Sequence, residues 1–154
     1  MRDSIEMPKG VFYTIVGICA AIIMLTSLEM LMKTKDMGMF ELWYKTSMEL
    51  KSDVVNQTME EAYSTYLNVC LSTFFVRVIA PIAVAIHSYF TFTKLRVNKF
   101  FVVIWTPIII GTFIMTTLGE KFYSIFFIGS GIGYLALIFT MFYLGKCIRN
   151  VKSI

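Results

Sequence analysis

The chain has 154 residues, of which 57% are hydrophobic and 16% charged, and its formal net charge is +4. An ordinary soluble domain has an apolar share of roughly 45 to 50%, so the composition excludes that class and indicates a membrane protein. The fourteen Lys and Arg residues are scattered singly at the ends of apolar runs, which argues against nucleic acid as a partner.

The first apolar stretch predicts a retained transmembrane helix over about residues 10–32. Only Glu29 interrupts it between Lys9 and Lys33. At about 1.5 Å per residue, the stretch can cross a hydrocarbon core of about 30 Å. A cleavable signal peptide is the alternative, but its apolar region would be shorter and followed by an A-x-A site, which does not occur here.

Residues 36–61 are more polar than the rest of the chain. Apolar and small residues recur in this segment at spacings of three and four: Phe40, Trp43, Ser47, Leu50 and Val54. This spacing predicts an external amphipathic helix. Phe40, Trp43 and Tyr44 suit a membrane interface, where amphipathic rings are favoured. The helix would either pack on the mouth of the bundle or offer a partner-binding or sensing surface.

The second span is predicted over about residues 68–93, and it contains Arg77 and the only histidine, His87. The surrounding apolar run is longer than the ~20 residues that a bilayer needs, so its first turns should stand outside the hydrocarbon. Pro81 cannot donate a hydrogen bond to the carbonyl of residue 77, which predicts a kink beside the charge. His87 fits a hydrogen-bonded packing residue better than a ligand.

The third and fourth spans are predicted over about residues 100–119 and 122–145. Short connections make neighbouring helices antiparallel, so spans two to four should form a compact unit, and the first span could pack on either side of it. The predicted fold is an all-α integral membrane protein with a single membrane domain over residues 1–154. It has four transmembrane helices, with the external amphipathic helix between the first and the second.

More Lys and Arg residues fall on the side of the two termini than on the opposite side, and they do so on shorter segments. Positive charge near membrane spans favours the cytoplasm. The sequence therefore predicts cytoplasmic N- and C-termini, an external amphipathic segment, and location in the plasma membrane.

This topology gathers several polar residues in the outer half of the bundle. The candidates for binding a substrate or ion are Glu29, Arg77, Thr112, Thr116 and Glu120. An arginine inside a span costs at least ~2.5 to 3.5 kcal/mol on insertion scales, so a carboxylate partner is expected, either Glu29 or Glu120. Three interpretations stay open for Arg77: a cavity that holds an anionic substrate, lipid headgroup or redox ligand; a structural ion pair with Glu29; or a side chain that snorkels outward.

Small residues form two further motifs. Gly129 and Gly133 make a GxxxG pair, and Gly17 with Ala21 makes a weaker small-xxx-small pair. Both allow a second helix to approach closely, either within the chain or in an oligomer.

The three cysteines, Cys19, Cys70 and Cys147, form no CxxC pair and no metal-ligand spacing with the lone histidine. The sequence therefore predicts no metal site and no disulfide scaffold. It also suggests no cofactor and no catalytic residue.

The leading functional hypothesis is a non-enzymatic subunit in the lipid bilayer, either a homo-oligomer or an accessory of a larger membrane transport or secretion assembly. The alternative is a small channel or transporter with a polar site around Arg77. A third hypothesis is a membrane enzyme acting on a lipidic substrate, which would require Arg77, Glu29, Glu120 and Tyr123 to converge.

Overall fold

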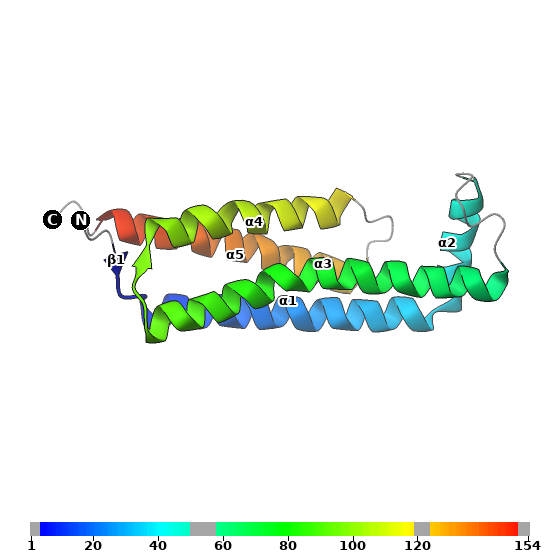
Figure 1. Cartoon of the computed structure of the whole chain (residues 1–154), viewed down its shortest axis with the longest axis horizontal. Helices are drawn as coiled ribbons and strands as arrows, with labels where there is room; N and C mark the ends of the chain where they lie inside the picture. The colour runs from blue at the N-terminus through cyan, green and yellow to red at the C-terminus, as the bar shows by residue number, and fades with distance from the viewer. Residues whose placement is uncertain (1–3, 50–57, 119–123, 151–154) are drawn as a thin grey trace.

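The computed structural model describes residues 4–49, 58–118 and 124–150, which form five helices and two short strands (Figure 1). In chain order the elements are β1 (Ser4–Ile5), α1 (Lys9–Lys35), α2 (Met37–Glu49), α3 (Met59–Thr93), β2 (Val97–Asn98), α4 (Lys99–Leu118) and α5 (Ile125–Asn150).

The long helices α1, α3, α4 and α5 are each long and apolar enough to cross a membrane. The prediction of an all-α fold with four spans and a short helix between the first and second is confirmed. The chain is a small polytopic membrane protein. Helix α4 has 20 residues and is therefore about 30 Å long, which matches one hydrocarbon core.

Helix α3 has 35 residues, about 50 Å, and it projects well beyond the end of α4 (Figure 1). Its start is set by a capping box: the Thr58 hydroxyl accepts a hydrogen bond from the Glu61 amide, and the Glu61 carboxylate accepts one from the Thr58 amide. Helix α2 (Met37–Glu49) covers the first part of the predicted segment 36–61. Leu50 and Val54 lie outside the described residues.

The four long helices form an antiparallel bundle in which α1 packs against α3 and α5, and α4 packs against the same two helices. The sequence left the side of α1 open, and the structure places it between α3 and α5. We call the end where α1 begins and α5 finishes the terminal end. The opposite end, where α2 lies, is the α2 end (Figure 1).

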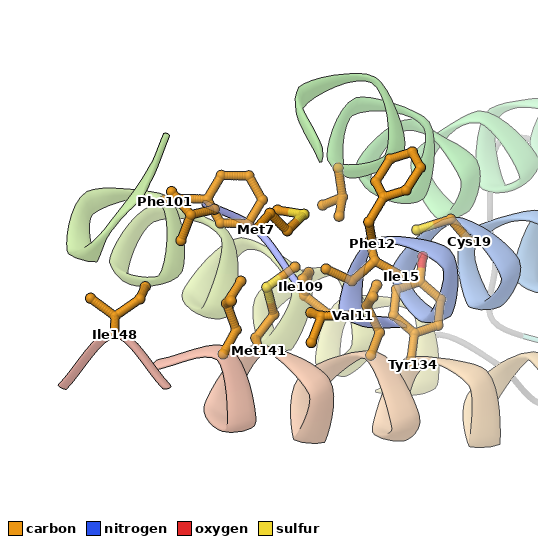
Figure 2. Close-up of a cluster of buried hydrophobic side chains, with 14 of the residues drawn as sticks. Met7, Val11, Phe12, Ile15, Cys19, Phe101, Ile109, Tyr134, Met141 and Ile148 are labelled. Atoms are coloured by element: carbon orange, nitrogen blue, oxygen red, sulfur yellow. The ribbon is translucent and has the colours of Figure 1, made fainter. Parts of the chain in front are cut away.

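The terminal end is held by apolar packing and by a small sheet. Strands β1 and β2 pair antiparallel, with Ser4 opposite Asn98, so the start of the chain is joined to the connection between α3 and α4. The core of this end contains side chains from α1, α4 and α5, including Phe12, Phe101 and Met141 (Figure 2). Phe12 also stacks on Phe92 of α3, with ring centroids 4.3 Å apart.

His87 connects two helices in the terminal half of the bundle. The Trp105 indole nitrogen of α4 donates a hydrogen bond of 2.8 Å to His87 Nδ1 of α3. The His87 ring also meets the Phe101 ring edge-on at 5.0 Å. The prediction that His87 is a hydrogen-bonded packing residue is confirmed.

The GxxxG pair is used inside the chain. A Cβ added at Gly133 would lie 2.7 Å from Ile22 Cγ1 of α1, and one at Gly129 would lie 3.1 Å from Leu25 Cδ1. The missing side chains therefore let α5 approach α1 closely. In contrast, a Cβ at Gly17 would meet no atom of the described chain within 4 Å, and Ala21 is exposed.

Candidate functional site

Arg77 of α3 contacts side chains of two other helices, α1 and α5, in the α2 half of the bundle. Its Nη1 lies 2.8 Å from Oε2 of Glu29 on α1, and its Nη2 donates to the Ser130 hydroxyl of α5 at 3.3 Å. The guanidinium carbon also lies 4.8 Å from the centroid of the Phe127 ring. Only 4% of Arg77 and 1% of Glu29 are exposed. Of the two carboxylates that the sequence offered, Glu29 is therefore a partner of Arg77, while Glu120 lies outside the described residues.

A second cation shares the same carboxylate. Lys33 lies one turn after Glu29 on α1, and its Nζ is 2.8 Å from Glu29 Oε1. Each carboxylate oxygen thus faces one cation. We call Glu29, Lys33 and Arg77 the charged triad.

The backbone carbonyl of Arg77 also accepts a hydrogen bond from another helix. Pro81, four residues later, has no amide hydrogen for the Arg77 carbonyl, although α3 continues through this proline. The hydroxyl of Tyr134 on α5 donates a hydrogen bond to that carbonyl instead. A tyrosine from another helix therefore satisfies the acceptor that the proline leaves without its helical donor.

A cavity of about 450 Å³ adjoins the charged triad, between α1, α2, α3 and α4. We call it the α2-end cavity. Besides the triad, its polar lining includes the hydroxyl side chains of Thr26, Thr46, Ser47, Tyr66, Ser72, Thr73 and Thr116. Most of its remaining wall is apolar, and Cys70 also contributes to it.

Helix α2 covers part of this cavity and is fixed by aromatic packing. Phe40 is 1% exposed, and its ring meets the α3 rings of Tyr63 at 5.1 Å and Tyr66 at 5.6 Å. The Tyr66 hydroxyl donates to the Lys33 carbonyl at 2.8 Å, which ties the end of α1 to α3. The amphipathic helix thus packs on the mouth of the bundle, and Trp43 lines the cavity.

The predicted site residues have different positions. Glu29, Arg77 and Thr116 line the cavity. Thr112 lies one turn from Thr116 and accepts its hydroxyl hydrogen bond through the backbone carbonyl, but its own side chain does not line the cavity. Phe40 faces α3, whereas Trp43 and Tyr44 are half-buried.

Lys33 was not among the site residues predicted from the sequence, where it marked the end of the first span and counted toward the charge balance. The spacing of four residues from Glu29 could have identified it, because residues four apart share a helix face. Tyr66 and Tyr134 were also missed. Both make hydrogen bonds to carbonyls of other helices, and no local pattern encodes such pairings.

The described residues contain no group of three His, Cys, Asp or Glu side chains that could hold a metal ion. The three cysteines, all within the described residues, form no disulfide; Cys19 is buried, and Cys70 and Cys147 are half-buried. No protein family model, curated protein or solved structure matches this chain.

Proposed function

We propose that the protein binds an anionic ligand in the α2-end cavity, as the substrate site of a small membrane transporter. The observation that carries this proposal is the buried guanidinium of Arg77. Its Nη1 lies 2.8 Å from Glu29 Oε2 and its Nη2 donates to Ser130, while its Nε has no hydrogen-bond partner among the described residues. An N–H without an acceptor is costly in the low-dielectric interior of a membrane protein, and a bound anion would supply the acceptor.

Two features of the cavity support binding of a discrete ligand. Its volume of about 450 Å³ falls in the range of about 300 to 1,000 Å³ that is typical of small-molecule sites. In addition, the buried Arg77 Nε has no hydrogen-bond partner among the described residues, and hydroxyls from α1, α2, α3 and α4 line the space. A few polar groups in a mostly apolar wall can fix the orientation of a ligand.

The cysteines of the chain provide a direct test. Cys70 lines the cavity, and Cys147 lies near the end of α5 at the terminal end. We expect dodecyl phosphate at about ten times its dissociation constant to slow N-ethylmaleimide labelling of Cys70 by ~10-fold, by mass action. Labelling of Cys147 should not change, and neutral dodecyl maltoside should give no protection.

Charge variants of α1 sharpen this test. Lys33→Gln removes a triad cation and should abolish protection of Cys70 by dodecyl phosphate. Lys35→Gln removes the same charge two residues later, at an exposed position outside the cavity lining, and should retain protection. Equal protection in both variants, or protection by the neutral detergent alone, contradicts anion binding at the triad.

A second candidate function is that of a self-associating subunit. The observation in its favour is that Gly17 and Ala21 lie exposed on α1, and that a Cβ added at Gly17 would meet no atom of the described chain within 4 Å, so a second helix could approach there. In a cysteine-free chain in native membranes, Ala21→Cys should form a disulfide-linked dimer. Val103→Cys on the exposed face of α4 is the control, and equal cross-linking at both positions contradicts the candidate.

The orientation of the bundle is also a proposal. The excess of Lys and Arg at the terminal end supports a cytoplasmic position for that end, which would put the cavity in the outer half of the membrane. In a cysteine-free chain in intact cells, a membrane-impermeant maleimide should label Lys35→Cys and not Lys146→Cys. The reverse pattern contradicts this orientation.

A further inference from the structure

Helix α2 forms one wall of the α2-end cavity and lies across the bundle, transverse to the four long helices (Figure 1). Its lining side chains share one face of the helix, at spacings of four, three and one: Met39, Trp43, Thr46 and Ser47. The opposite face carries exposed charged residues, Glu41 and Lys45. Helix α2 thus separates the cavity from the water beyond the α2 end.

A second side of the cavity faces hydrocarbon. It is lined by Val76 of α3 and Met115 of α4, which are 51% and 72% exposed. Both residues belong to helices that are long and apolar enough to cross a membrane, and a charged molecule enters hydrocarbon only at a high cost. A water-soluble anion therefore reaches the cavity from the side that α2 covers.

One side chain anchors α2 to the bundle. Phe40 is the only buried side chain in the described part of α2, and it packs against the rings of Tyr63 and Tyr66 on α3. Trp43 also contacts the Tyr66 ring, at 5.4 Å between centroids, but it is only half-buried. Segments with few buried apolar contacts are the ones that open locally while the rest of a protein stays folded.

The connection between α1 and α2 is a single residue. Helix α1 ends at Lys35 and α2 begins at Met37, so Asp36 alone joins them. The Asp36 carboxylate caps α2, because its Oδ1 accepts a hydrogen bond of 2.9 Å from the Gly38 amide. Hinges are formed by a few residues at the ends of elements, where the backbone dihedral angles can change. Asp36 is in such a position.

The two tyrosines that hold Phe40 also fix the last turn of α1. The Tyr63 hydroxyl donates a hydrogen bond of 3.2 Å to the Thr34 carbonyl. The Tyr66 hydroxyl donates one of 2.8 Å to the Lys33 carbonyl. Neither bond involves α2, so both can remain when Phe40 leaves the rings. Helix α2 can therefore move without a movement of α1 or α3.

We infer that α2 is a hinged lid that controls access from water to the α2-end cavity. Packing of Phe40 against Tyr63 and Tyr66 closes the lid, and rotation at Asp36 opens it. This inference rests on the proposed function, because it assigns the route by which the ligand of that site enters. The movement of the lid can be measured without any ligand.

The test measures how fast Cys70, which lines the cavity, is labelled in the purified full-length chain in dodecyl maltoside micelles. The reagent is 2-sulfonatoethyl methanethiosulfonate, which is charged and water-soluble. We expect Phe40→Ala to raise the labelling rate ~10-fold or more, because the buried ring no longer holds the lid closed. Leu42→Ala is the matched control, since Leu42 is 45% exposed on α2 and does not line the cavity. Its rate should equal that of the natural chain.

Cys19 reports in the same experiment whether the bundle stays folded. Its side chain is fully buried in the apolar core, so the reagent should not label it in either variant. Equal Cys70 rates in Phe40→Ala and Leu42→Ala overturn the lid. Labelling of Cys19 together with Cys70 in Phe40→Ala overturns it as well, since Phe40 would then support the whole bundle and not α2 alone.

Two substitutions of Tyr63 separate the ring contact from the hydrogen bond. Tyr63→Leu removes the ring that the Phe40 ring meets at 86° and should raise the Cys70 rate about 3-fold, as expected for the loss of an aromatic pair. Tyr63→Phe keeps the ring and loses only the bond to the Thr34 carbonyl, so its rate should match that of the natural chain. Equal rates in the two variants contradict closure by ring packing.

The lid and the proposed function fail in different measurements. Labelling rates without ligand decide whether α2 moves, and an unchanged Cys70 rate in Phe40→Ala overturns the lid while leaving anion binding intact. Protection of Cys70 by dodecyl phosphate decides whether the cavity binds an anion. If dodecyl phosphate protects the natural chain, its release from Phe40→Ala should be ~10-fold faster or more, for the same reason. Equal release rates would show that the ligand does not pass the lid.

Discussion

The two ends of the bundle are built from the same four helices but held together by different interactions. At the terminal end, apolar side chains such as Ile15, Leu137 and Met141 fill the interior, and a short sheet joins the start of the chain to α4 through β2. At the α2 end, the interior contains the ion pair of Glu29 and Arg77. These two are the buried charged residues of the described chain.

This difference supports the proposal that the α2 end binds a ligand and that the terminal end mainly stabilises the bundle. Apolar packing without charges is sufficient to hold the terminal end, whereas buried ion pairs contribute little net stability compared with apolar residues of the same volume. A charged triad beside a cavity is therefore poorly explained as a device for stability alone. Positions where a chain departs from simple packing rules are the expected locations of function.

The largest effect on stability should come from Glu29→Gln. This change leaves Lys33 and Arg77 without their shared carboxylate, and breaking a buried ion pair costs about 3 to 5 kcal/mol. Thermal unfolding in detergent micelles measures the loss. The matched control is Glu6→Gln at the terminal end, where an 88% exposed carboxylate lies 4.0 Å from Arg96 and exposed pairs contribute little. Equal melting temperatures for the two variants would contradict the expected difference between the buried ion pair at the α2 end and the exposed pair at the terminal end.

A smaller effect is expected for Gly133→Ala, which tests the close contact of α5 with α1. The new methyl group would lie 2.7 Å from Ile22 Cγ1, so the Ile22 side chain or the helices must shift, and overpacking of this kind costs about 1 to 3 kcal/mol. Gly17→Ala is the control, since open space surrounds that position. Chemical unfolding should show a loss for Gly133→Ala only, and a stable Gly133→Ala chain would refute the close packing.

Tyr134→Phe should cost about 1 to 2 kcal/mol, because the buried Arg77 carbonyl loses its donor. Pro81→Ala restores an amide that can bond the same carbonyl within the helix. In the Pro81→Ala background, Tyr134→Phe should therefore cost less than it does in the natural chain. A double-mutant cycle measures the coupling, and additive effects would show that the two residues do not serve one acceptor.

The smallest effect is expected at the terminal end for Trp105→Phe. The variant keeps a ring beside His87 but removes the indole donor, and a single hydrogen bond contributes about 1 kcal/mol. The melting temperature should fall slightly, and anion protection of Cys70 should be unchanged because Trp105 lies outside the cavity lining. A loss of protection would mean that the two ends are coupled.

Much of the fold was predictable because membrane spans have strong local signals. Long apolar runs predicted the four spans, and the cost of a buried charge predicted a carboxylate partner for Arg77, either Glu29 or Glu120. The pairing of Tyr134 with the Arg77 carbonyl was not predictable. Those residues are 57 positions apart, and hydropathy does not specify which faces of two helices meet.

The position of Phe40 shows a second limit of prediction from the sequence. Its spacing correctly indicated an amphipathic helix, but the apolar face of such a helix can meet either lipid or protein. The structure buries Phe40 against Tyr63 and Tyr66 of α3. Likewise, the long connection after α1 did not determine on which side of the bundle α1 packs. These arrangements depend on tertiary contacts and not on local periodicity.

Native mass spectrometry of the full-length chain tests the central claim most directly. The protein is released from dodecyl maltoside micelles in the presence of dodecyl phosphate. We expect one dodecyl phosphate to remain bound to the natural chain and to Lys35→Gln, but not to Lys33→Gln. Retention of the neutral detergent to the same extent as dodecyl phosphate, or equal retention of dodecyl phosphate by both variants, would contradict a binding site at the charged triad.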